Sequence, residues 1–517
     1  MRTPLVTTRL GATWRCALLL VCPVLVAACT NLDEDPPSAI TPGNFYRNEA
    51  EVMSSLAGVY AQLRGTLDDY YNLSEITTDE MIVPTRGSDW YDGGVWREMH
   101  HQTWTPVSTV GNGPGNGAWV VAFTGISRAN TLLEALPNVS FPARDTIVAE
   151  VRTLRAFYYY LLMDMFGGVP IVTTTELMER PRATRDSVFR FIEAELNATR
   201  ATLPAHWNQA NHGRMTKGAC DAILASMYLN AEIFTGTLTA GALTRGPARW
   251  ADAITAAQRI RNDPMYQLAD TFVQSFRADN STSPENILVI KFAPLDGLGL
   301  NFIMRSLHYS QFGPPTPWNG FATLAQTYNA FDAADERRKV ILAGPQVNVE
   351  TNQPVQDRGG APLVFTTTIA DETQASEGEG ARPYKWPVDR LHVAQNNGND
   401  FAWFRLGEIY LIEAEAENEL GNTATALALV DSLRARAFEP DQPLPTGVSQ
   451  DSARTLIHAE RLFELAFEGK RRQDLIRYGK YGDAWGFKLP SAIYRILMPI
   501  PQNQMDANSL LAQNPGY

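Results

Sequence analysis

The sequence predicts a mainly α-helical fold, in which helix pairs form a scaffold and long irregular loops with a few short strands form the rest. Three observations support this fold class. Apolar residues recur at spacings of three and four in several segments, which is the period of one face of a helix. Glycine and proline follow these segments where helices are expected to end. Two long stretches without this period are rich in turn-forming residues.

Residues 1–28 are predicted to be a lipoprotein signal peptide. Three arginines and no acidic residue accompany an apolar run over residues 17–28, which is shorter than the roughly 20 residues of a membrane-spanning helix but suits a cleaved signal. The run ends at residues 26–29 (Val-Ala-Ala-Cys), which match a lipobox. A chance cysteine in an apolar run is the alternative, and the polar stretch that follows from Thr30 argues against it.

Cys29 is therefore predicted to carry the lipid, and residues 29–44 to form an acidic tether. Each buried methylene of a lipid chain contributes about 0.8 kcal/mol, and more than one chain gives a stable anchor. Residues 31–35 (Asn-Leu-Asp-Glu-Asp) cannot bury enough apolar surface to order themselves.

Cleavage leaves Cys220 as the one cysteine besides Cys29, so no disulfide framework is predicted. Loss of the three arginines takes the formal net charge from -12 to -15. This charge, without any basic run, excludes nucleic acid as a partner. The mature chain is long enough for a large core. We divide it into an N-terminal part over residues 45–278 and a C-terminal part over residues 279–517, packed as one unit.

The clearest helical pattern runs from Val151 to Met165, where the apolar residues form one stripe. Residues 167–170 (Gly-Gly-Val-Pro) end that helix with both kinds of helix breaker. Gly421 is predicted to be the left-handed C-cap between two further helices. The other helical segments are residues 45–64, 118–136, 185–203, 216–234, 401–420 and 423–437. These helix hairpins have the size seen in tetratricopeptide arrays, although no regular repeat is legible.

Two stretches interrupt the helical pattern. Residues 76–117 are rich in Gly, Pro, Trp and Asp. Residues 279–395 are also irregular and contain short strand-like pieces, such as 286–292 and 362–369. Loops of this length in a helical domain are typical of binding surfaces or insertions.

A series of short strings follows in order from the lipobox to the last residue. Among them are residues 40–46 (Ile-Thr-Pro-Gly-Asn-Phe-Tyr), 154–159 (Leu-Arg-Ala-Phe-Tyr-Tyr), 166–170 (Phe-Gly-Gly-Val-Pro), 404–411 (Phe-Arg-Leu-Gly-Glu-Ile-Tyr-Leu), 498–501 (Met-Pro-Ile-Pro) and 513–517 (Gln-Asn-Pro-Gly-Tyr). Through these strings the chain resembles the SusD/RagB family of outer-membrane nutrient-binding lipoproteins.

The resemblance implies a SusD-like fold, with a tetratricopeptide-like helix-pair scaffold and long loops. It implies a lipid-anchored protein on the cell surface that covers a TonB-dependent, SusC-like outer-membrane transporter barrel. It also implies an oligosaccharide ligand or, in some members, a peptide. No catalysis and no cofactor are attributed to the family, so we expect a binding protein and not an enzyme.

Aromatic and polar residues of the two irregular stretches are the candidate ligand contacts. An indole face complements the C–H face of a sugar ring, and charged side chains can hold hydroxyl groups through charge-assisted hydrogen bonds. The candidates are Asp79, Glu80, Arg86, Asp89, Trp90, Tyr91, Trp96, Tyr309, Trp318 and Asn319. Trp104 and Trp119 are expected to pack against the scaffold instead.

Other charged residues are expected to be structural. Glutamates of residues 401–420 should face water or pair with arginines such as Arg434 and Arg436. No metal site is predicted, because His100-His101 is the only histidine pair and no zinc motif is present. Three alternatives stay open: peptide capture at the same loops, a structural lid without a ligand site, and a glycoside hydrolase that pairs Asp79 or Glu80 with Asp89.

Overall fold

The computed structural model describes residues 45–517. Within this range, Asn48–Tyr517 form one compact unit. The predicted signal peptide (1–28), the lipidated Cys29 and the tether (29–44) lie outside the described residues.

Helices make up most of the regular structure of this compact unit, which confirms the predicted mainly α-helical class. The helices are α2 (Glu49–Ala61), α3 (Asp69–Glu75), α4 (Val95–His101), α5 (Asn116–Ala135), α6 (Arg144–Phe166), α7 (Arg185–Thr199), α8 (Lys217–Leu229), α9 (Ala231–Phe234), α10 (Trp250–Arg261), α11 (Phe302–Ser306), α12 (Ala325–Ala330), α13 (Leu406–Glu419), α14 (Thr423–Arg434), α15 (Gln450–Leu465), α16 (Arg471–Arg477) and α17 (Gln502–Ala507).

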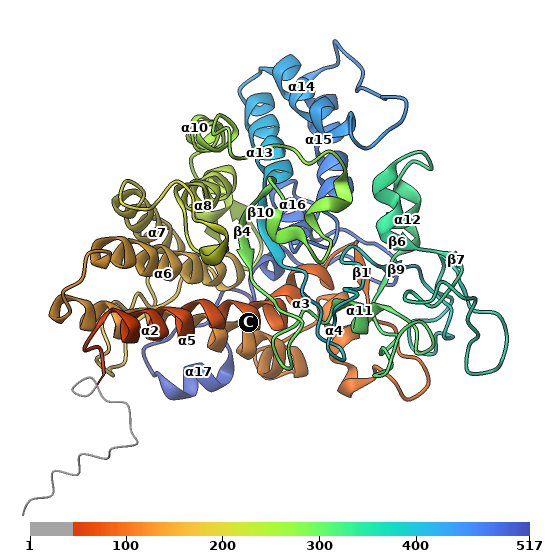
Figure 1. Ribbon diagram of the computed structural model, residues 1–517, viewed down its shortest axis with the longest axis horizontal. Helices are drawn as coiled ribbons and strands as arrows, with labels where there is room; N and C mark the ends of the chain where they lie inside the picture. Colours follow the sequence, from red (N-terminus) through yellow and green to blue (C-terminus); the bar gives the residue numbers. More distant parts are fainter. Residues whose placement is uncertain (1–44) are drawn as a thin grey trace, which may run out of the picture. The chain divides into compact units, whose positions relative to one another are not determined.

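The longer helices pack against their neighbours to form a scaffold. Helix α5 packs on α6 and α6 on α7, while α8 packs on α10, α10 on α13, and α13 on both α14 and α15. Figure 1 shows this series extending from α5 and α6 to α14. Gly421 has a φ of 89° between α13 and α14, as the predicted left-handed C-cap requires.

Helix α6 is deeply buried over its C-terminal two thirds. The sequence predicts one apolar stripe, but nearly every side chain from Glu150 to Phe166 is buried. The reason is that α5, α7 and α8 all pack against α6, so it has no face left for solvent. Gly167 follows it with a φ of 74°, and the helix ends there as predicted.

The strands are short and pair in antiparallel twos. The pairs are β1 (Met81–Ile82) with β5 (Ala322–Thr323), β2 (Thr237–Leu238) with β3 (Leu243–Thr244), β4 (Asn286–Ile290) with β10 (Phe401–Arg405), β6 (Ile341–Leu342) with β9 (Arg382–Pro383), and β7 (Gly344–Pro345) with β8 (Val364–Phe365). Strand β10 corrects the predicted helix over residues 401–420, whose first five residues are strand. Aromatic side chains suit a strand, and β4 supplies the backbone partner.

The glutamates of α13 are a second correction. The sequence predicts that they face water or pair with arginines such as Arg434 and Arg436; Glu413 and Glu415 do pair with arginines, but Glu408, Glu413 and Glu415 are buried. Their partners are Lys470 at 2.9 Å, Arg261 at 2.7 Å, and Arg477. Because charged groups lose hydration inside a protein, each needs such a partner.

Arg405 is at the centre of a buried ion cluster that joins the C-terminal helices. Its guanidinium donates to Glu285 at 2.7 Å, to Glu464 at 2.6 Å and to Glu468 at 2.7 Å. Arg436 also binds Glu285 and Glu464, at 2.6 and 2.5 Å. The cluster fixes the end of β10 between the loop that carries Glu285 and helix α15.

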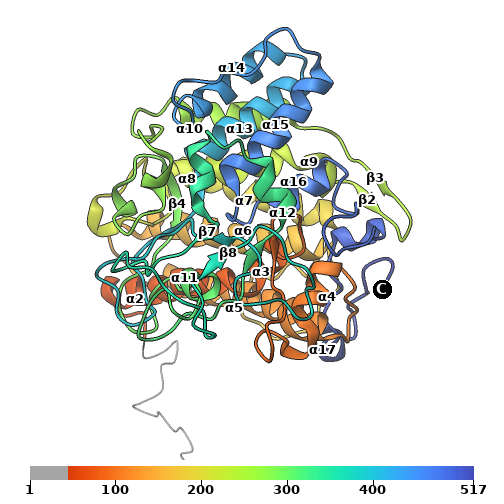
Figure 2. The same ribbon diagram turned by 90° about the vertical axis from the view of Figure 1, so that its right-hand side faces the viewer.

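The two irregular stretches lie side by side. Strand β1 from the first pairs with β5 from the second, and the N–H of Thr85 donates to the carbonyl of Glu372 at 2.8 Å. Figure 1 places α4, α11 and α12 together beside the helical scaffold, and Figure 2 shows α11, α12, β7 and β8 on the face turned toward the viewer. This pairing brings loops that are distant in sequence onto one surface.

Candidate ligand-binding site

Three tryptophans from the two irregular stretches meet at this surface. The ring of Trp90 lies 5.4 Å from that of Trp96 and 6.5 Å from that of Trp318, measured between centroids. Phe321, which is buried, lies 5.6 Å from Trp90 and 5.7 Å from Trp96. We call Trp90, Trp96, Trp318 and Phe321 the aromatic platform. Trp318 is 36% exposed, and Tyr91, next to Trp90 in the chain, is 55% exposed.

The backbone of residues 90–94 turns sharply and sets the positions of Trp90 and Trp96. Trp90 has a φ of 63°, and Gly93 and Gly94 have φ values of 66° and 84°, a left-handed region that glycine adopts readily. The indole N–H of Trp96 then donates to Asp92 Oδ2 at 2.7 Å. This bond holds the Trp96 ring over the turn.

A hydrogen bond and a close contact join the two loops of the platform. The indole N–H of Trp90 donates to the carbonyl oxygen of Trp318 at 2.6 Å. The Trp90 ring covers Gly320 so closely that a Cβ added there would lie 2.2 Å from Trp90 Cε2. Glycine at position 320 is therefore a condition for this arrangement of the indole.

Polar side chains line one side of the platform. Tyr309 donates its hydroxyl hydrogen to Asp89 Oδ2 at 2.5 Å. The guanidinium of Arg358 lies 4.3 Å from the centre of the Tyr309 ring, contacts Asp89 at 3.6 Å and binds Glu377. We call Asp89, Tyr309, Arg358 and Glu377 the polar rim.

The polar rim carries an ionised acceptor, Glu377, beside the cation of Arg358. Partial burial would raise the pKa of Glu377, but hydrogen bonds from Arg358 and from His308 lower it to about 2. His308 Nε2 lies 3.0 Å from Glu377. Burial and the neighbouring Asp89 raise the pKa of Tyr309 to about 12, so its hydroxyl stays a donor. A sugar hydroxyl can both donate to a carboxylate and accept from Arg358.

Asp79 and Glu80 are corrections to the predicted set of ligand contacts, because Asp79 is only partly exposed and binds Arg471, and Glu80 is buried. Asp79 accepts from Arg471 Nη2 at 2.6 Å. Glu80 is 1% exposed and accepts from the N–H of Phe467 at 3.0 Å. Burial raises the pKa of Glu80 to about 7, against the opposing effect of Arg471. Both carboxyl groups attach the segment before β1 to the C-terminal part.

Arg86 and Asn319 are also buried, and they support the polar rim from behind. Arg86 donates to the carbonyl oxygens of Ser376 and of Glu379. The amide of Asn319 donates to the carbonyl of Glu377 at 3.1 Å and accepts from Arg382 at 3.0 Å. Their predicted role as direct contacts is corrected to that of positioning the loop that carries Glu377.

Five of the six remaining candidates are brought together by the structure: Asp89, Trp90, Trp96, Tyr309 and Trp318. Tyr91 is exposed and follows Trp90 in the chain. Sequence reasoning missed Arg358, Glu377 and Phe321, because no local pattern marks them within the second irregular stretch. The glycines after Arg358 are the one available signal, since they mark a loop tip.

Two further predictions concern the tryptophans outside the site and the carboxylates of the hydrolase alternative. Trp104 is fully buried and Trp119 nearly so, as expected. The hydrolase alternative requires two carboxyl groups on either side of one bond. Asp79 binds Arg471, Glu80 accepts from the N–H of Phe467, and Asp89 binds Tyr309 and Arg358, so the three carboxyl groups are held by different partners.

Residues 45–517 contain neither a membrane-spanning helix nor a cluster of metal-ligating side chains. No helix in that range is both long and apolar enough to cross a membrane. The same residues contain no group of three or more His, Cys, Asp or Glu side chains that could hold a metal ion. Cys220 is free and buried.

Comparisons with known proteins agree along nearly the whole chain. Residues 267–517 match the model of the SusD family, and residues 31–229 match the model described as starch-binding associating with outer membrane. The chain is 24% identical to SusD-like protein P25 of Formosa agariphila, over 94% of this chain and 96% of that protein. It is also 24% identical to the starch-binding protein SusD of Bacteroides thetaiotaomicron, over 97% and 98%.

Solved structures share the fold. A laminarin binding SusD-like protein is 25% identical, with a TM-score of 0.72 over 91% of this chain and 100% of that chain. The surface glycan-binding protein A from Bacteroides thetaiotaomicron, solved in complex with laminarihexaose, has a TM-score of 0.73 over 91% and 100%. Its identity to this chain is 20%, and the likeness therefore concerns the fold.

Proposed function

The chain belongs to the SusD/RagB family, and on that premise we propose that it is an outer-membrane protein that captures oligosaccharides on its aromatic platform. Its role is binding and not catalysis. The captured oligosaccharide passes to a TonB-dependent, SusC-like barrel that the protein covers.

The observation that carries this proposal is the meeting of Trp90, Trp96 and Trp318 at one surface. Tryptophan that serves only the core is buried, as Trp104 is, whereas Trp318 keeps about a third of its surface exposed at 36%. The Trp90–Trp318 hydrogen bond joins the two long loops that carry these rings. The relatives named for starch and laminarin support a sugar as the ligand.

The binding mechanism follows from the two parts of the site. The exposed rings of Trp318 and Tyr91 offer apolar faces on which the C–H groups of a pyranose can lie. Asp89, Arg358 and Glu377 lie beside them and can take the equatorial hydroxyl groups through charge-assisted hydrogen bonds. Movement of the whole protein on the barrel then releases the ligand inward.

Cys29 is proposed as the lipid attachment that keeps the protein at the outer membrane and the cell surface. The family model that describes outer-membrane association supports this location. Labelling cells with a radioactive fatty acid tests the attachment: we expect label in the native protein and none after Cys29→Ser. Equal labelling of both proteins would exclude Cys29.

The ligand proposal is tested by isothermal titration of the purified chain with laminarihexaose and with maltohexaose. We expect at least one of them to bind. Trp318→Ala should weaken that binding on the order of tenfold, because burying one indole face contributes about 1–2 kcal/mol. Trp250→Ala is the matched control, since Trp250 is also a partly exposed tryptophan but begins α10, far from the platform (Figure 1).

The possible results separate the claims. Normal affinity in Trp318→Ala would place the ligand elsewhere on the protein. No binding to either glycan, together with binding to a library of short peptides, would exclude carbohydrate capture in favour of peptide capture. A transporter partner is tested separately, by co-purification of a barrel protein with the native, lipid-bearing chain.

A further inference from the structure

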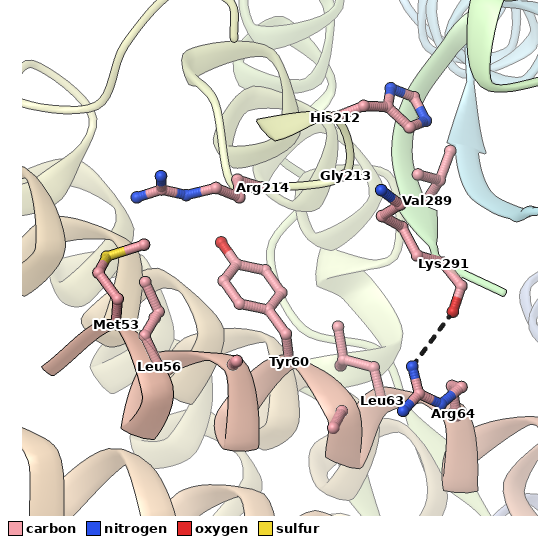
Figure 3. A pocket seen from close by; sticks show the side chains of 12 residues that line it. Met53, Leu56, Tyr60, Leu63, Arg64, His212, Gly213, Arg214, Val289 and Lys291 are labelled. Carbon is pink, nitrogen blue, oxygen red and sulfur yellow. Dashed lines mark hydrogen bonds between the residues drawn. The ribbon is translucent and has the colours of Figure 1, made fainter. Parts of the chain in front are cut away.

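A second cavity lies away from the platform, between helix α2, the loop at residues 212–214 and strand β4. Its volume is about 380 Å³, within the range of about 300–1,000 Å³ that is usual for small-molecule sites. Figure 3 shows the side chains of α2 and the adjoining helical turn on one side, and those of the loop and of β4 on the other.

The helical side of this cavity is mostly aliphatic. Its apolar residues are Met53, Leu56, Ala57, Ala61 and Leu63, and Tyr60 and Arg64 line it as well. Val289 of β4 continues this surface on the opposite side. No acidic side chain lines the cavity. The occupant must therefore have an apolar body and no cationic group that needs a carboxylate.

Two cations border the apolar surface. Lys291 forms no ion pair with any described residue, and Arg64 makes a single long hydrogen bond, at 3.4 Å, to the carbonyl oxygen of Lys291. The Lys291 stem packs across Gly213, where an added Cβ would lie 2.7 Å from its Cγ. In Figure 3 the ammonium group lies beside Gly213, on the cavity side of the strand.

The other polar groups of the cavity are already satisfied by protein partners. Arg214 binds the buried Glu150 and stacks 3.8 Å from the centre of the Trp207 ring. The Tyr60 hydroxyl donates to Glu150 at 2.8 Å and accepts from the N–H of Met215 at 2.7 Å.

His212 is satisfied in the same way, because its Nε2 lies 3.2 Å from Asp400. These groups form walls of the cavity, and the charge that is left for a ligand comes from Lys291 and Arg64.

We propose that this cavity binds a small organic anion with an apolar body, an aliphatic carboxylate being the simplest example. The hydrocarbon part lies on Met53, Leu56 and Leu63, where each buried methylene contributes about 0.8 kcal/mol. The carboxylate accepts a hydrogen bond from Lys291 beside Gly213, and Arg64 adds positive charge at the other end of the Lys291 residue. This site is separate from the aromatic platform and does not depend on the function proposed above.

The probe for this site is octanoate, titrated calorimetrically into the complete mature chain. Two comparison compounds separate the parts of the ligand: octan-1-ol has the apolar body without the charge, and glucuronate has the carboxylate without the apolar body. We expect octanoate to bind, octan-1-ol to bind on the order of tenfold more weakly, and glucuronate not to bind.

Two substitutions locate the binding. Lys291→Met keeps the stem and removes the charge, and should weaken octanoate on the order of tenfold. Lys291 is exposed, so the variant should fold normally. Ala61→Phe fills the apolar side of the cavity and should abolish binding. Lys480→Met is the matched control, because Lys480 is an exposed lysine outside the cavity.

The proposal is overturned by any of three results. These are the absence of octanoate binding at millimolar concentration, octanoate binding that neither Lys291→Met nor Ala61→Phe weakens, and glucuronate binding as tightly as octanoate. Trp318→Ala should leave octanoate affinity unchanged. If it abolished octanoate binding, the anion would occupy the aromatic platform and the cavity would be excluded.

Discussion

Gly320 lies under the Trp90 indole, and the substitution Gly320→Ala tests how far the platform depends on that contact. The backbone at Gly320 does not have a left-handed φ, so alanine can adopt it without strain. What position 320 lacks is the space for the methyl group of alanine. The new Cβ would lie 2.2 Å from Trp90 Cε2 and 2.4 Å from Cζ2, where ordinary contacts are 3.4–4 Å.

The magnitude follows from the displacement that is required. The indole must retreat by about 1 Å, and overpacking of this kind costs roughly 1–3 kcal/mol. The same movement stretches the 2.6 Å bond from the Trp90 N–H to the Trp318 carbonyl, whose loss costs about 1 kcal/mol more. We expect the free energy of unfolding to fall by roughly 2–4 kcal/mol and glycan affinity to fall on the order of tenfold.

The assay combines urea unfolding with calorimetric titration of the glycan that the native protein binds. Gly241→Ala is the control, because an added Cβ at Gly241 meets nothing within 4 Å. Unchanged stability and unchanged affinity in Gly320→Ala would show that the Trp90 ring does not occupy the position described. A loss of stability with normal affinity would separate the contact from ligand binding.

Two further predictions concern the buried charges. The raised pKa of Glu80, about 7, means that the folded state holds the Glu80 proton more tightly than the unfolded state does. The resulting contribution to the free energy of unfolding is complete below about pH 4.5 and is lost as the pH rises through 7. In urea unfolding, the free energy of unfolding of Glu80→Gln relative to that of the native protein should therefore rise by a few kcal/mol between pH 5 and pH 8. An equal difference between the two proteins at both pH values would refute the protonated state of Glu80. Arg405→Met leaves Glu285, Glu464 and Glu468 short of a partner and should lower the free energy of unfolding by about 3–5 kcal/mol. Arg454→Met at the surface should cost less than about 1 kcal/mol, and similar losses in both variants would contradict the cluster.

Local sequence information predicted the features that depend on neighbouring residues. Helix α6 ends at Gly167 because glycine tolerates the φ of 74° found there. Trp90 and Trp96 are six positions apart, so one short loop and the first turn of a helix suffice to bring them together. Their part of the platform could therefore be predicted from composition and spacing.

Pairing across long sequence separations could not be predicted in this way. Trp90 binds the carbonyl of Trp318 across 228 positions, and Asp89 meets Tyr309 across 220. Glu80 stands beside the predicted site in the sequence, yet it points toward Phe467 in the interior. Neighbouring residues in a turn face different directions, and a list of residues does not record those directions.

The sequence by itself determined the helical class of this protein, its family and the two irregular loop regions, because periodicity, helix breakers and family strings are local properties. Only the tertiary structure decided which side chains of those loops share a surface and which are buried. It assembled the polar rim of Arg358 and Glu377, and it gave Asp79, Glu80, Arg86 and Asn319 structural roles. The physical reason is that burial and charge pairing depend on segments hundreds of residues apart, and these meet only when the chain is folded.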